Sequence, residues 1–316
     1  MEMRLNKIRL KPDWFGLGLN LLPSWVVAAW LSYQASWYWS HSPEMHFGWI
    51  VLVLCGFLVT EVAIQQPFVK PRWGPGPILL VMMGVLALLM FQLYQAAFGT
   101  MPASLIILAF GVMLIITANI VAVYGVVALG TLGFAFYFLL IAIPLPSIIQ
   151  SLLVSNLQLF VAFMDEELLN LMGIPAQRTG SIIQLPSGQV GVDDACSGFR
   201  SLQSSIMAGM FIGFLLFKGW GWRITLVVIS VLFAILGNLG RTLFLCYQGA
   251  ANGIESIKGV HDAAGWSVMA FTAAGVGGAS WVGLSAQRRI AQVHKPRKVS
   301  GRTVAEVAAP RENDRK

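Results

Sequence analysis

Long apolar runs with almost no charged residues recur along this chain of 316 residues. A helix needs about 20 such residues to cross the hydrocarbon core of a bilayer, where every backbone polar group must be bonded within the segment. Only 11% of the residues are charged, against about 25% in soluble domains. The sequence therefore predicts an all-α polytopic membrane protein. Eight spanning helices are expected, at residues 15–38, 48–65, 77–97, 103–123, 126–143, 201–217, 224–245 and 264–286.

The basic residues predict how these helices are oriented. With eight spans, seventeen of the 21 Lys and Arg residues fall on one side of the membrane, and the positive-inside rule makes that side cytoplasmic. Both termini are then cytoplasmic, and this topology accounts for the net charge of +7 without nucleic-acid binding. The seventeen residues are Arg4, Lys7, Arg9, Lys11, Lys70, Arg72, Lys218, Arg223, Arg288, Arg289, Lys295, Arg297, Lys298, Arg302, Arg311, Arg315 and Lys316.

Two boundaries in this arrangement need interpretation. The fourth and fifth spans almost meet at Tyr124 and Gly125. Residues 147–163 could form a ninth span, which would move the basic C-terminal tail outside. They carry a polar stripe that includes Gln150 and Asn156, so we interpret them as an amphipathic helix that lies on the outer surface or packs on the bundle.

The chain divides into a membrane domain, residues 1–286, and a basic cytoplasmic tail, residues 287–316. The tail is polar and poor in aromatic residues, as disordered segments are. The basic N-terminus followed by an apolar run is similar to a signal peptide, but the run is too long, so we interpret it as an uncleaved first span.

The longest outer segment, residues 144–200, leads to a cysteine. Residues 181–192 alternate around a Pro-Ser-Gly turn and predict a β-hairpin that leads to Cys196 at the start of the sixth span. A helix N-terminus and Arg200, four residues further on, both favour a thiolate at Cys196. Asp193 and Asp194 oppose it electrostatically.

Two further groups fall at the same outer boundary. Arg241 lies near the outer end of the seventh span, one turn from Asn238, and His261 precedes the eighth span beside Asp262. Arg241 could instead be an arginine that extends to the interface, and His261 a solvated loop residue.

Together, Cys196, Arg241 and His261 supply a nucleophile, a cation for an oxyanion and a base that can become an acid. The competing interpretation is a Cys196–Cys246 disulfide in an oxidising compartment. Cys55 lies within a span and is expected to fill apolar space. The Cys and His spacing predicts no metal site, and no cofactor is expected.

Three motifs resemble those of the exosortase/archaeosortase family. They are Ala-Cys-Ser-Gly-Phe-Arg-Ser at 195–201, Asn-Leu-Gly-Arg at 238–241, and His-Asp-Ala-Ala-Gly at 261–265. They occur in the family's order and at plausible spacing, and the resemblance covers the chain from about the second span to the eighth. It implies a cysteine peptidase or transpeptidase, with no cofactor, at the outer face of the cytoplasmic membrane.

The implied substrates are proteins with a C-terminal sorting signal of the PEP-CTERM type: a short Pro-containing motif, one membrane helix and a basic tail. By this resemblance Cys196, Arg241 and His261 are catalytic, and the supporting residues are Arg200, Asn238, Ser197 and Asp262. The expected partners are such substrates and membrane lipid; the acceptor, an amine or water, stays open. A multi-pass transporter, and a polysaccharide-assembly protein or acyltransferase without cysteine catalysis, are the alternatives.

Overall fold

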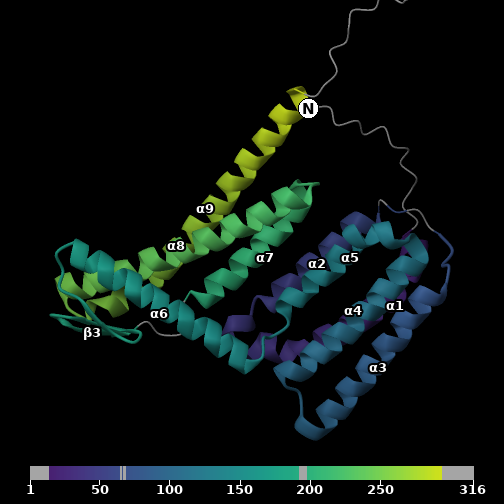
Figure 1. The fold of residues 1–316 in the computed structure, drawn as a ribbon, viewed down its shortest axis with the longest axis horizontal. Helices are drawn as coiled ribbons and strands as arrows, with labels where there is room; N and C mark the ends of the chain where they lie inside the picture. Colours follow the sequence, from purple (N-terminus) through teal and green to yellow (C-terminus); the bar gives the residue numbers. More distant parts are fainter. Residues whose placement is uncertain (1–13, 65, 67–68, 192–197, 294–316) are drawn as a thin grey trace, which may run out of the picture.

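The computed structural model describes residues 14–64, 66, 69–191 and 198–293, and most of these residues are helical. The helices form two groups that lie side by side (Figure 1). The first group contains α1 (Trp14–His41), η1 (Pro43–Met45), α2 (Gly48–Ala63), α3 (Pro75–Phe98), α4 (Pro102–Tyr124), η2 (Val126–Gly130), α5 (Leu132–Tyr137) and η3 (Phe138–Ala142). The second contains α6 (Ser147–Leu171), strands β1 (Gln177–Thr179), β2 (Ile182–Leu185) and β3 (Gly188–Gly191), and helices α7 (Phe199–Leu216), α8 (Trp220–Asn252) and α9 (Ser256–Val293).

Seven helices of the described residues are long and apolar enough to cross a membrane, by length and composition. Six of them coincide with predicted spans: the segment Pro43–Ala63 that contains α2, and α3, α4, α7, α8 and α9. The 28-residue α1 covers the predicted first span, although it is not among the seven. The predicted all-α polytopic fold is confirmed.

The predicted continuous span at residues 126–143 is wrong, because the structure breaks this segment into η2, α5 and η3. Helix α4 ends at Tyr124, where Gly125 has a φ of 81°, so the expected end of the fourth span at these two residues is present. Thr131, with φ −120° and ψ −71°, separates η2 from α5. The broken segment packs on α2 and buries Phe136 and Phe138 completely, so it forms the core of the first group.

The helix predicted at 147–163 is present and extends to Leu171 as α6. It packs against α8, β1 and β2, and it lies beside the C-terminal half of α8 (Figure 1). Length and composition alone would count α6 as a span. Its assignment to the outer surface, and the cytoplasmic location of both termini, stay predictions.

Residues 246–263, which lie between the last two predicted spans, are mostly helical. Helix α8 continues to Asn252 and α9 already begins at Ser256, with a tight turn at Gly253, whose φ of 85° favours glycine. His261 therefore lies in the second turn of α9 and not in a loop before it. At its other end α9 continues to Val293, beyond the expected limit at 286, and residues 294–316 of the tail lie outside the described residues.

The predicted hairpin is confirmed: β2 and β3 are antiparallel, with Ile183 opposite Val190 and Leu185 opposite Gly188. A third strand, β1, pairs with β2 and was not predicted, because it is only three polar residues long. Glu166 of α6 anchors it by accepting hydrogen bonds from the Arg178 backbone N–H (2.9 Å) and side chain (3.3 Å). The sheet is thus fixed to α6.

A buried polar cluster joins α1 to α4 in the first group. The Asn119 side chain donates to the Asn20 carbonyl (3.0 Å) and to the Ser24 hydroxyl (2.9 Å). The Asn20 side chain in turn donates to the carbonyl of Val69 (3.0 Å), in the connection between α2 and α3. Three separate segments are therefore held together by hydrogen bonds among otherwise apolar helices.

Replacing Asn119 with leucine should lower the stability of the protein in detergent by about 1–2 kcal/mol, since two hydrogen bonds between helices are lost and the Ser24 hydroxyl loses a donor. The measurement is thermal unfolding of the purified protein. Thr60→Val is the control, because the exposed Thr60 hydroxyl bonds only to its own helix. Equal melting temperatures for Asn119→Leu and the wild type would contradict this role.

Candidate active site

The start of α7 is pressed against α8. Gly198 precedes α7 with a φ of 82°, and its carbonyl accepts hydrogen bonds from the Leu202 N–H (2.9 Å) and the Ser201 hydroxyl (2.8 Å). A Cβ atom at Gly198 would lie 2.7 Å from Cγ of Asn238. Both the backbone conformation and the lack of space require glycine here. The contact fixes the first turn of α7 onto the turn of α8 that carries Asn238.

Cys196 and Ser197, as well as Asp193 and Asp194, lie outside the described residues. Gly198, where the description resumes, is two residues beyond Cys196 in the chain. Cys246 is 1% exposed and packs with Val161, Ile183 and Leu185. The predicted alternative of a Cys196–Cys246 disulfide stays untested.

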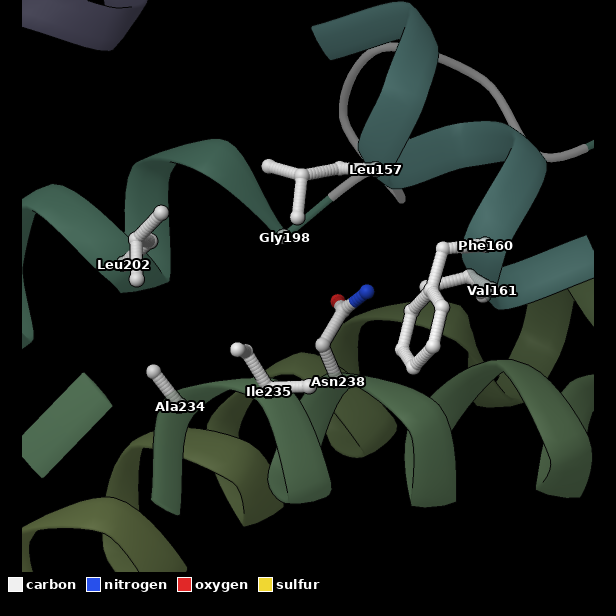
Figure 2. Close-up of a pocket in the computed structure, with 8 residues that line it drawn as sticks. All are labelled: Leu157, Phe160, Val161, Gly198, Leu202, Ala234, Ile235 and Asn238. Carbon is white, nitrogen blue, oxygen red and sulfur yellow. The ribbon is translucent and has the colours of Figure 1, made fainter. Parts of the chain in front are cut away.

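Asn238 is 4% exposed and lies where α6, α7 and α8 meet. Figure 2 shows its amide pointing from α8 toward Gly198, with Leu157 and Phe160 of α6 nearby. Eight residues line the small pocket at this point: Leu157, Phe160, Val161, Gly198, Leu202, Ala234, Ile235 and Asn238. All other side chains in this lining are apolar, so the Asn238 amide is its polar group.

Arg241 and His261, which were predicted from different spans to share a site, are in contact. The Arg241 Nη2 lies 3.0 Å from Nε2 of His261, and Nδ1 of His261 lies 3.3 Å from Oδ1 of Asp262. Gly265, one turn further along α9, lies beside the Arg241 guanidinium: a Cβ built there would be 3.8 Å from Nη2. Helices α8 and α9 therefore present a cation and an imidazole to each other.

This geometry determines the protonation of the imidazole. A guanidinium has only donors and stays charged, so Nε2 of His261 must be the acceptor in this pair. The ring proton is then on Nδ1, where it can be donated to Asp262. The Asp262 side chain is 97% exposed, so water competes for that bond. His261 thus carries an unprotonated Nε2, as a general base requires.

Arg200, predicted to support the thiol, forms an ion pair with Glu44 of η1 at 3.5 Å. Both side chains are partly exposed, so the pair adds little stability, but it joins the α1–α2 connection to the first turn of α7. Glu44 was not among the predicted site residues, although it is the one acid between the first two predicted spans. No group of three or more potential metal ligands gathers within the described part of the chain.

Comparison with known proteins identifies the family of this chain. Residues 39–278, which include all three motifs, match the family described as transmembrane exosortase (Exosortase_EpsH). Searches of curated proteins and of solved structures give no match. The match covers more than half of the sequence and runs from the end of α1 well into α9. The chain therefore belongs to the transmembrane exosortase family.

Proposed function

We propose that this protein is a membrane-embedded cysteine peptidase or transpeptidase that cleaves, and transfers, proteins carrying a C-terminal sorting signal. Membership of the exosortase family supports a membrane sorting transpeptidase in general. The observation that carries the proposal is the 3.0 Å contact between Arg241 and His261, one turn from Asn238. Asn238 in turn abuts Gly198, two residues from Cys196 in the chain.

The first half of the reaction forms a thioester. His261 Nε2 takes the proton of the Cys196 thiol, and the sulfur attacks the scissile carbonyl carbon of the substrate. The carbonyl π electrons move to its oxygen, and the Arg241 guanidinium stabilises that oxyanion. When the intermediate collapses, the C–N bond breaks and His261 gives its proton to the leaving amine.

The second half releases the acyl group. An amine or water attacks the thioester carbonyl, His261 accepts the proton of the nucleophile, and the Cys196 sulfur leaves and is reprotonated. In the structure Nε2 already accepts a hydrogen bond from Arg241. The base is therefore available only when this guanidinium N–H turns toward another acceptor, and the developing oxyanion is such an acceptor. This exchange couples proton transfer to stabilisation of the transition state.

The substrates we infer have a short Pro-containing motif, one membrane helix and a basic tail. The protein lies in the cytoplasmic membrane with its site at the outer face. A membrane enzyme suits such a substrate because the substrate helix can approach through the bilayer, which aligns the outer end of that helix with the first turn of α7.

Replacing Cys196 with alanine should lower substrate processing by about a thousandfold or more, since no thioester can form. The measurement is the fraction of a co-expressed reporter with a sorting signal that is cleaved, at matched enzyme levels in the membrane. Cys246→Ala is the matched control and should process normally, because Cys246 packs in an apolar cluster. Normal processing by Cys196→Ala would contradict the assignment of Cys196 as the nucleophile. Loss of processing in Cys246→Ala would favour the Cys196–Cys246 disulfide.

Replacing His261 with alanine should lower kcat by about 10²- to 10⁴-fold through loss of general base catalysis. Asp262→Asn should cost less than about tenfold, because the Asp262 carboxylate is exposed and orients the ring only weakly. Steady-state kinetics of the purified enzyme would measure both. Equal losses in the two variants would contradict this weak orienting role and show that catalysis by the imidazole depends on its aspartate.

The predicted topology exposes Cys196 to reagents that cannot cross the membrane. In a variant with Cys55 and Cys246 changed to serine, a membrane-impermeant maleimide added to intact cells should label the protein at Cys196 and stop processing of the reporter in parallel. Changing Cys196 to serine as well should abolish the labelling. Labelling that requires permeabilised cells would reverse the orientation, and labelling without loss of processing would favour a protein that needs no cysteine.

A further inference from the structure

Asp165 of α6 is completely buried although it carries a carboxyl group. It follows Leu157 and Val161 at spacings of four residues, so these three side chains lie on one face of α6. Leu157 and Val161 line the pocket beside Asn238 of α8. Thr242, one turn further along α8, lies close enough to Asp165 to interact with it. The acid therefore lies between α6 and the turn of α8 that carries the site.

Neither oxygen of Asp165 has a hydrogen-bond partner among the described residues. Thr242 is close enough to interact, but its hydroxyl donates to the carbonyls of Asn238 (3.2 Å) and Leu239 (3.1 Å) on its own helix. One hydroxyl proton cannot serve three acceptors well, so Thr242 donates within its own helix and not to Asp165. Both bonds to Thr242's own helix are long, so little holds the hydroxyl in this direction.

The adjacent acids show that burial of Asp165 is specific to its position. Glu166 accepts two hydrogen bonds from Arg178, and Glu167 is exposed to solvent. Burial of a carboxyl group without a partner is unfavourable to folding. Leucine has the same branched shape, although it is larger, and would avoid that cost, so packing alone does not account for aspartate at this position.

We propose that Asp165 is a positioning residue. When substrate is bound, its carboxylate accepts a hydrogen bond from the Thr242 hydroxyl, and this bond fixes the α8 turn that presents Asn238 and Arg241. Thr242 is four residues from Asn238 and adjacent to Arg241 in the chain. A bond from Thr242 to α6 would set the rotation of α8 about its own axis, and with it the direction of both side chains. The inference rests on the proposed function, because its readout is turnover.

Three variants test this role in the full-length protein. Asp165→Leu removes the acceptor, Asp165→Asn keeps one acceptor oxygen, and Thr242→Val removes the donor with almost no change of shape. We expect Asp165→Leu to raise the melting temperature while it lowers kcat at least tenfold, with KM changed less than threefold. Thr242→Val should lower kcat similarly, and Asp165→Asn should restore part of the loss.

The double variant Asp165→Leu, Thr242→Val should be no slower than either single variant if the two groups act through one bond. Glu167→Gln is the matched control, since it removes the neighbouring charge at an exposed position and should leave melting temperature and kcat unchanged. A lower melting temperature or failure to fold in Asp165→Leu, an unchanged kcat, or independent losses in the double variant would each overturn the inference.

These outcomes are distinct from failure of the proposed function. If the wild-type enzyme processes no reporter and forms no acyl adduct on Cys196, the proposed function fails, and the positioning role fails with it. If the wild type is active and Asp165→Leu is equally active, only the positioning role is wrong.

Discussion

The close approach of α7 to α8 at Gly198 and Asn238 governs the arrangement of the second helix group. The space between these residues admits no Cβ, and the φ of 82° at Gly198 suits glycine. Any other residue would move the first turn of α7 away from α8, and with it the pocket and the ion pair between Arg200 and Glu44. A single backbone position thereby links the connection between α1 and α2 to the turn that carries Asn238.

A polar contact joins α8 to α9 near the predicted outer end of the seventh span. Arg241 on α8 meets His261 on α9, and the guanidinium fixes the imidazole as an acceptor at Nε2. An arginine in such a place needs a partner or water, so the same contact that makes Arg241 tolerable also sets the protonation of the histidine. The hydrogen bond between Arg241 and His261 thus serves both the packing of α8 on α9 and the proposed chemistry.

The sequence predicted helices well and their interruptions poorly. Apolar length predicted α3, α4, α7 and α8 because lipid requires helices, but the break at Thr131 depends on packing against α2 that no local pattern encodes. The extension of α8 and α9 around Gly253 was missed because residues 246–263 are too polar to be counted with the apolar runs on either side. Arg241 and His261 were placed together correctly by span order, whereas Asp165 looked no different from Glu166 and Glu167. Only tertiary packing separates a buried acid from an exposed one.

The cost of burying Asp165 and the poor geometry of the Thr242 hydrogen bonds have a common explanation. In the proposed mechanism Nε2 of His261 is released from Arg241 during each turnover, so α8 would hold Arg241 firmly in one state and let it turn in another. A fully bonded interface between α6 and α8 would fix one arrangement, since buried networks without free acceptors favour a single state. Asp165, which has no donor among the described residues, lies beside a hydroxyl held by two long bonds, and this leaves a second arrangement within reach. Stability given up at this contact is therefore consistent with a helix that must reposition one side chain for catalysis.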